Sequence, residues 1–180
     1  MSLPNKLSVL RILLVPAIVA TLVYYHPERD WLRLLAFGLF VFGALTDALD
    51  GIIARSTRQS SQLGALLDPI ADKLLILGTL IACSTIHGLP EWMRIPAWFN
   101  LVVISRDVLV IIGALVVFVT QGRWGLQPDQ LGKCATFSQM LVIPAVLLHW
   151  PIREEIILGA SVFTLLSAVS YVRLGLRLLS

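Results

Sequence analysis

Charged residues are scarce in this chain. Only 14% of its 180 residues are Asp, Glu, Lys or Arg, and 57% are hydrophobic. A soluble domain would carry roughly a quarter charged residues. The net charge of +3 is too small to indicate nucleic-acid binding, and the two cysteines, Cys83 and Cys134, lie in separate apolar segments without CxxC spacing. The cysteines therefore indicate neither a disulfide framework nor a zinc site, and the long apolar runs predict a polytopic membrane protein rather than a globular one.

The apolar runs predict an all-α integral membrane protein with six transmembrane helices, preceded by a short amphipathic interfacial helix at residues 3–11. The spans are expected at residues 12–25, 31–55, 64–87, 96–120, 130–150 and 154–178. The polar triplet Ser105-Arg106-Asp107 is expected to interrupt the fourth span. No internal repeat stands out, so residues 1–180 are predicted to form a single domain.

The distribution of basic residues predicts the orientation. With six spans both termini lie on one side, and that side carries most of the arginine and lysine. The residues concerned are Lys6, Arg11, Arg55, Arg58, Arg123, Lys133, Arg173 and Arg177. The positive-inside rule makes this side cytoplasmic. We therefore expect a protein of the plasma membrane or bacterial inner membrane, with both termini and the site described next facing the cytoplasm.

Four aspartates stand out against the apolar background. Asp47 and Asp50 are three residues apart, and Asp68 and Asp72 are four apart, so each pair shares one face of a helix. Two facing pairs would form an oxygen-lined pocket of the kind that Mg²⁺ or Mn²⁺ prefers. The alternative is that the aspartates cap helices or pair with neighbouring cations. Those cations are Arg55, Arg58 and Lys73.

The aspartates belong to a longer pattern, Asp47-x₂-Asp50-Gly51-x₂-Ala54-Arg55-x₈-Gly64-x₃-Asp68-x₃-Asp72. At every fixed position and spacing it resembles the signature of the CDP-alcohol phosphotransferase family. Pro4-Asn5 and Arg11 also resemble the amino-terminal stretch of the family's phosphatidylglycerophosphate and cardiolipin synthases. The resemblance implies transfer of a phosphatidyl group from CDP-diacylglycerol to an alcohol, with release of CMP. It also implies a homodimer.

The resemblance further implies the roles of the motif residues. Asp47, Asp50 and Asp68 would bind two ions of Mg²⁺ or Mn²⁺, and Asp72 would complete the site and act as general base. Two cations would offset the charge of a pyrophosphate donor and hold its leaving group. The residues expected to bind the CDP donor are Asn5, Gly51, Ala54, Arg55 and Gly64.

The acceptor alcohol is expected to carry a phosphate. Arg106 lies within an apolar span, where an ionisable residue suggests a functional site, and Lys133 and Arg11 could assist it. The alternative for Arg106 is a structural pair with Asp107 or a motif aspartate. Gly132-Lys133-x₂-Thr136-x₂-Gln139 resembles the phosphatidylglycerophosphate synthases, whose acceptor is glycerol 3-phosphate. Ser105-Arg106-Asp107 instead resembles the cardiolipin synthases, whose acceptor is phosphatidylglycerol.

The predicted function is thus synthesis of phosphatidylglycerophosphate from CDP-diacylglycerol and glycerol 3-phosphate, with cardiolipin synthesis as the alternative. A divalent-cation transporter could also use four intramembrane aspartates. It would have no need of the fixed Gly-x₂-Ala-Arg between them, and repeat halves or broken mid-membrane helices are not evident. The expected partners are CDP-diacylglycerol, a phosphorylated alcohol and the lipid bilayer, without nucleic acid.

Overall fold

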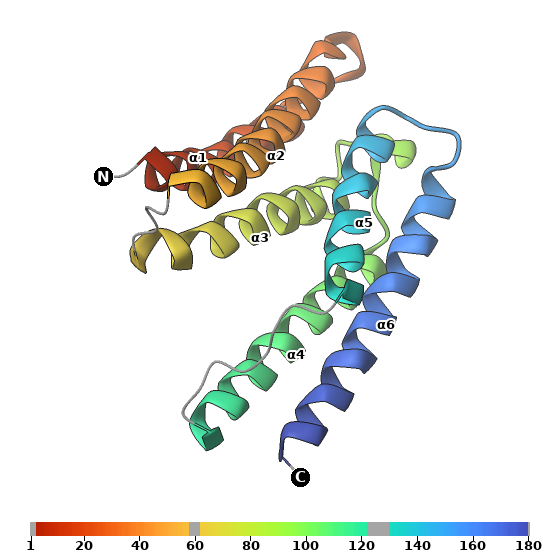
Figure 1. The fold of residues 1–180 in the computed structure, drawn as a ribbon. Helices are drawn as coiled ribbons and strands as arrows, with labels where there is room; N and C mark the ends of the chain where they lie inside the picture. Colours follow the sequence, from red (N-terminus) through yellow and green to blue (C-terminus); the bar gives the residue numbers. More distant parts are fainter. Residues whose placement is uncertain (1–2, 58–61, 122–129, 180) are drawn as a thin grey trace. The chain divides into compact units, whose positions relative to one another are not determined.

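The computed structural model describes the backbone of residues 3–57, 62–121 and 130–179, and the side chains of residues 7–46, 68–120 and 130–175. Within these ranges the chain is helical and contains no strand (Figure 1). The α-helices are α1 (Leu3–Val23), α2 (Trp31–Thr57), α3 (Gln62–Thr85), α4 (Ala97–Gln121), α5 (Gln130–Leu147) and α6 (Arg153–Leu179). Two short 3₁₀ turns, η1 (Pro27–Arg29) and η2 (Glu91–Met93), lie in the connections before α2 and α4.

The all-helical prediction is confirmed, and the predicted helix limits lie within a few residues of those observed. Two details differ. The amphipathic stretch at residues 3–11 is not a separate helix but forms the first turns of α1. The predicted interruption of the fourth span is wrong, because α4 continues through Ser105, Arg106 and Asp107. A polar side chain does not break a helix whose backbone bonds are all made, and the last two of these side chains are buried.

Two stretches of the described residues are long and apolar enough to cross a membrane. They are 91–120, which contains an 18-residue window with a mean hydropathy of 2.5, and 153–175, which contains one with a mean hydropathy of 1.7. Residues 7–23 and 31–46 form shorter apolar helices. These findings support membrane association, and the count of six spans stays a prediction.

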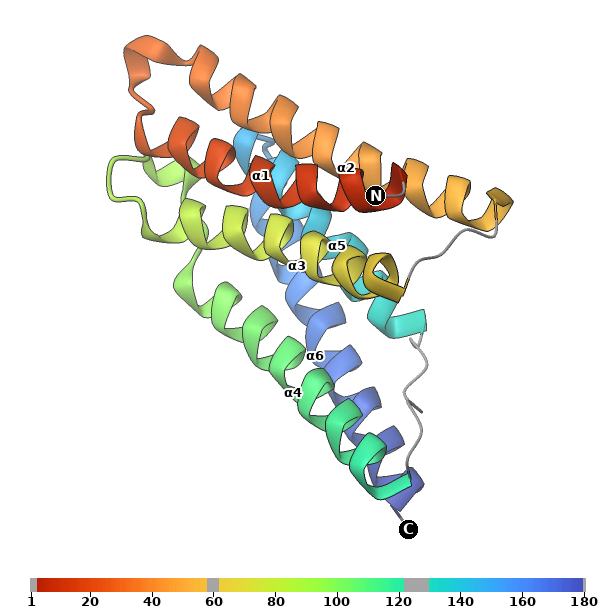
Figure 2. The same ribbon diagram turned by 90° about the vertical axis from the view of Figure 1, so that its left-hand side faces the viewer.

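The chain divides into two compact units. Unit 1 contains residues 1–94 with 146–148, and unit 2 contains residues 95–145 with 149–180. In unit 1, α1 lies alongside both α2 and α3 (Figures 1 and 2). Two glycines permit close approach of these helices: a Cβ on Gly78 of α3 would lie 2.6 Å from Val15 Cγ1 of α1, and one on Gly43 of α2 would lie 2.8 Å from Leu75 Cδ2 of α3 and 3.3 Å from Leu14 Cδ1 of α1. Small residues let membrane helices pack closely in this way.

Arg33, near the start of α2, makes several contacts at one end of unit 1. Its Nε and Nη2 donate to the two carboxylate oxygens of Asp30 at 2.7 and 2.5 Å, and its Nη1 donates to the carbonyl of Leu147 at 2.5 Å. The guanidinium also lies over the ring of Trp92, 5.6 Å from its centroid. Hydrogen bonding to Arg33 lowers the pKa of Asp30. Arg33 thus links the connection before α2 to the last residue of α5 and to the connection before α4.

In unit 2, α4 and α6 pack side by side along much of their length (Figure 2). The face of α6 that is buried carries a row of small or aromatic hydroxyl residues. They are Ser161, Thr164, Ser167 and Tyr171, which recur every three or four positions and so share one face of the helix. The opposite side of α6 exposes large apolar residues such as Leu158 and Val162. This polarity pattern is the inverse of a soluble helix and suits a helix that faces lipid.

Candidate active site

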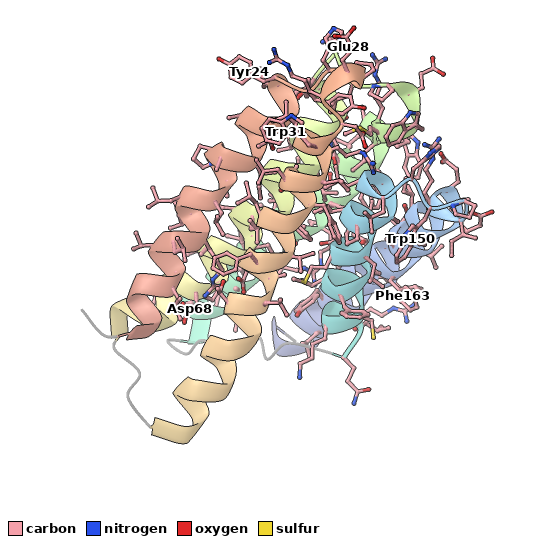
Figure 3. All side chains as sticks on the ribbon, turned by 90° about the horizontal axis from the view of Figure 1, so that it is seen from above. Tyr24, Glu28, Trp31, Asp68, Trp150 and Phe163 are labelled. Carbon is pink, nitrogen blue, oxygen red and sulfur yellow. The ribbon has the colours of Figure 1, made fainter. Side chains whose placement is uncertain are left out.

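The described part of the aspartate motif lies where α1 packs on α3. Asp68 and Asp72 are one helical turn apart on α3, and each side chain is 33% exposed. Asp68 lies at the end of unit 1 remote from Tyr24 and Glu28 (Figure 3). The predicted sharing of one helix face by these two aspartates is confirmed, because both reach toward the same residue of α1.

That residue is Arg11, whose side chain is fully buried. Its Nη1 is bonded to Asp72 Oδ1, and its Nη2 lies 3.4 Å from Asp68 Oδ1. Ser8, one turn earlier on α1, donates its hydroxyl to the same oxygen of Asp68. The sequence predicts that Arg11 contacts the acceptor's phosphate, whereas in the structure it contacts the two aspartates.

The chemistry of Asp68 and Asp72 fits a divalent cation. Their oxygens converge on one positive charge, the Arg11 guanidinium, and carboxylates are ligands that Mg²⁺ and Mn²⁺ prefer. Among the described side chains there is no group of three or more Asp, Glu, His or Cys that could hold a metal. Asp47 and Asp50 lie on the continuous helix α2, but their side chains fall outside the described residues. The predicted donor-binding residues Asn5, Gly51, Ala54, Arg55 and Gly64 also lie outside the ranges whose side chains are described.

The second group of predicted site residues lies in unit 2. Arg106 on α4 is only 6% exposed and donates from Nε and Nη2 to the hydroxyl of Ser167, at 3.1 and 2.9 Å. Its Nη1 donates to Asp107 Oδ1 at 2.8 Å, so the structural pair considered as an alternative exists. The guanidinium lies over the ring of Tyr171, 5.3 Å from the centroid. A buried arginine is therefore held by side chains from both α4 and α6.

The start of α5 approaches this arginine. A Cβ on Gly132 would lie 3.0 Å from Arg106 Nη2 and 2.9 Å from the hydroxyl oxygen of Tyr171. Lys133, the next residue, is exposed. Further along α5, Gln139 is fully buried and donates to Thr164 at 3.0 Å. The pattern that includes Gly132, Lys133 and Gln139 thus lies on a helix that contacts α6 at Gly132 and Gln139.

Three residues around these sites were not predicted from the sequence. Ser8 was not singled out, although it lies three positions before Arg11 and so shares its helix face. Ser167 and Tyr171 were also missed. The signal for both was the periodic row of hydroxyl residues in an otherwise apolar helix, since such residues usually hydrogen-bond across or within helices.

An all-helical, membrane-associated fold with a convergent pair of carboxylates defines a class of membrane protein with a candidate cation site. Comparison with known proteins makes the class specific. The CDP-alcohol phosphatidyltransferase family matches residues 1–169, and the chain belongs to this family.

Three relatives illustrate the names that similar proteins carry. The chain is 35% identical over 147 residues to a Cereibacter sphaeroides protein named CDP-diacylglycerol--glycerol-3-phosphate 3-phosphatidyltransferase, covering 82% of this chain and 63% of the relative. It is 35% identical over 187 residues to a Pseudomonas fluorescens protein of the same name, covering 96% and 89%. A Mycobacterium tuberculosis protein, provisionally named as a cardiolipin synthase, is 36% identical over 148 residues, covering 82% and 65%. The chain therefore spans slightly less than two thirds of the first and third of these relatives.

Proposed function

We propose that this protein transfers the phosphatidyl group of CDP-diacylglycerol to glycerol 3-phosphate, giving phosphatidylglycerophosphate and CMP, in a reaction that needs a divalent cation. The observation that carries the proposal is the family match over residues 1–169, which includes the whole aspartate motif. The names of the Cereibacter and Pseudomonas relatives support the same acceptor.

In this proposal Asp47, Asp50, Asp68 and Asp72 hold Mg²⁺ or Mn²⁺, with two ions in the site. The bound cations offset the negative charge of the donor's pyrophosphate and of the departing CMP. The convergence of Asp68 and Asp72 on one guanidinium supports their half of the site. The donor's nucleotide is assigned to Asn5, Gly51, Ala54, Arg55 and Gly64.

Asp72 is assigned the role of general base. Its carboxylate accepts the proton of the acceptor's hydroxyl, whose oxygen attacks the phosphorus of the phosphatidyl group. The bond from that phosphorus to CMP breaks, and CMP leaves with the electron pair. The carboxylate of Asp72 is partly exposed. A partly exposed carboxylate can reach a substrate hydroxyl and later release the proton to water.

Arg106 and Lys133 are assigned to the acceptor's phosphate. Three of the five N–H groups of Arg106 bond to Ser167 and Asp107, which leaves two for a ligand. Arg11 is the third cation assigned to the acceptor. Since it is bonded to Asp68 and Asp72, it would contact a phosphate only by sharing or exchanging these partners.

Cardiolipin synthesis is the second candidate, with phosphatidylglycerol as acceptor. Two observations favour it: the triplet Ser105-Arg106-Asp107 and the similarity to the Mycobacterium relative. Both acceptors present a hydroxyl and a phosphate, so the same residues would serve either reaction.

We further propose that the chain crosses the membrane six times and acts as a homodimer, with its termini and aspartates on the cytoplasmic side. The excess of Lys and Arg on that side supports the orientation. Cysteine labelling of single-cysteine variants at the two ends of α4 in intact cells tests it. Labelling of the carboxy-terminal end of α4, near Gln121, from outside the cell would contradict it.

An acceptor screen tests the proposed reaction. Purified protein in detergent receives labelled CDP-diacylglycerol, Mn²⁺ and one acceptor at a time: glycerol 3-phosphate, phosphatidylglycerol, serine or inositol phosphate. We expect labelled phosphatidylglycerophosphate with glycerol 3-phosphate. Product with phosphatidylglycerol and none with glycerol 3-phosphate would replace the first candidate by the second.

A further inference from the structure

The surroundings of Arg106 are more elaborate than a helix contact needs. Its Nε and Nη2 converge on one oxygen, Ser167 Oγ, at 3.1 and 2.9 Å, so one edge of the guanidinium is fixed on α6. Nη1 is held by Asp107 on its own helix at 2.8 Å. Contacts along two directions leave the planar group little freedom to rotate.

The face of the guanidinium is fixed as well. The ring of Tyr171 lies 5.3 Å from its central carbon, one helical turn beyond Ser167 on α6. A cation over an aromatic face is attracted to the ring, most strongly where water is excluded, and Arg106 is 6% exposed. Ser167 therefore holds an edge of the group and Tyr171 holds a face.

Gly132 determines how closely α5 approaches. A Cβ there would lie 3.0 Å from Arg106 Nη2 and 2.9 and 3.2 Å from two atoms of Tyr171. Any side chain would push the arginine or the tyrosine out of place. Glycine at this position also lets the start of α5 carry the exposed Lys133 to the neighbourhood of the guanidinium.

We infer that Ser167 and Tyr171 are positioning residues for Arg106, and that they present its two remaining N–H groups to the phosphate of the acceptor. Gly132 keeps the space that this arrangement needs. The inference rests on the proposed function and deepens it, because it extends the acceptor site to residues of α5 and α6. A fixed guanidinium binds phosphate better than a mobile one, since little freedom is lost when the complex forms.

The test compares two serine variants on the same helix. Ser167→Ala removes the hydroxyl that holds Arg106. Ser161→Ala is the matched control, since Ser161 is also buried on α6 but donates to the carbonyl of Ile157 in its own helix. We expect Ser167→Ala to raise the KM for glycerol 3-phosphate about tenfold with an unchanged KM for CDP-diacylglycerol, because a small misplacement of a binding group is costly. Ser161→Ala should change neither constant.

Tyr171 gives a second, independent comparison should Ser167→Ala fail to fold. Tyr171→Phe keeps the ring and should leave the acceptor KM nearer to that of the unaltered protein than Tyr171→Leu, which removes the ring. Equal acceptor KM values for Ser167→Ala and Ser161→Ala, or for the two Tyr171 variants, would overturn the inference, as would equal changes in both KM values.

The same measurements separate this inference from the proposed function. If the unaltered protein uses phosphatidylglycerol but not glycerol 3-phosphate, the proposed function is wrong. The KM ratios are then measured with phosphatidylglycerol, which also carries a phosphate, and a selective rise in Ser167→Ala still supports the positioning role.

Discussion

The buried guanidinium of Arg11 on α1 is bonded to the carboxylate of Asp72 on α3. The same guanidinium reaches Asp68, one turn earlier, so a single positive charge serves two residues of the aspartate motif. Like charges that lie close together destabilise a folded protein unless a cation offsets them. Arg11 is thus the internal counter-ion of a site that we propose to hold divalent cations.

Replacing Arg11 by Gln should destabilise the protein more in the presence of EDTA than with Mn²⁺, since a bound cation can take over the missing charge. Removing one partner of a fully buried ion pair costs about 3–5 kcal/mol, and the loss should be smaller here because both carboxylates are partly exposed. Thermal unfolding in detergent measures the effect, with Arg11→Lys as the charge-conserving control. An equal loss under both conditions would argue against a cation at Asp68 and Asp72.

Ser8→Ala removes the hydroxyl that donates to Asp68. Outer partners that orient a metal-binding carboxylate typically contribute about 10–100-fold to metal affinity or activity. We therefore expect CMP release by this variant to need about tenfold more Mn²⁺. Thr21→Val is the control, because Thr21 also lies on α1 and donates only to the carbonyl of Ile18 in its own helix. An unchanged Mn²⁺ requirement in Ser8→Ala would assign Ser8 a packing role.

Asp72→Asn separates binding from chemistry. Loss of a general base typically lowers the rate about 10²–10⁴-fold, whereas an amide can still accept hydrogen bonds. We expect slow turnover with a donor KM close to that of the unaltered protein. A variant whose donor binding is impaired as strongly as its turnover would make Asp72 chiefly a metal ligand.

Gly78→Ala should lower the unfolding temperature, because the new Cβ would lie 2.6 Å from Val15 Cγ1, on a β-branched side chain that cannot easily turn aside. Gly38→Ala is the control. A Cβ at Gly38 meets nothing within 4 Å, and alanine favours helix over glycine. If both substitutions had the same effect, the close approach of α1 and α3 would not depend on Gly78.

The pair of Asp30 and Arg33 predicts a pH dependence of stability. Arg33 lowers the pKa of Asp30 from its usual 3.8, so the unfolded chain binds this proton more readily than the folded one. The stabilisation is complete above the usual pKa and is lost as the pH falls through the lowered one. Asp30→Asn should therefore lose stability relative to the unaltered protein at pH 6 and lose less at pH 3. A difference that does not vary with pH would contradict the assignment.

The helices could be predicted from the sequence because apolar runs of sufficient length alternate with polar or proline-containing connections. The sharing of one face by Asp68 and Asp72 followed from their spacing alone, since positions four apart on a helix are neighbours. The sequence left two roles open for Arg106, binding of a phosphate and an ion pair with Asp107 or a motif aspartate. The neighbouring residues in the sequence do not decide between these roles, and the structure shows the pair with Asp107.

The partners across helices could not be predicted. Whether Arg11 faces Asp72 depends on the rotation and register of α1 against α3, which glycine contacts such as Gly78 on Val15 determine in three dimensions. The same holds for Ser167 and Arg106, which are 61 residues apart in the chain. Sequence periodicity identifies the buried face of a helix but not the residue that lies opposite it.

The central claim is phosphatidyl transfer that depends on the aspartate motif. Its most direct test measures CMP released from CDP-diacylglycerol on addition of glycerol 3-phosphate, with Mn²⁺ or EDTA, for the unaltered protein and for Asp68→Asn. The account predicts CMP and phosphatidylglycerophosphate in equal amounts for the unaltered protein with Mn²⁺, and none with EDTA or for a folded Asp68→Asn variant, because an amide lacks the charge that a hard cation requires. Undiminished CMP release by Asp68→Asn, or release that persists in EDTA, would contradict it.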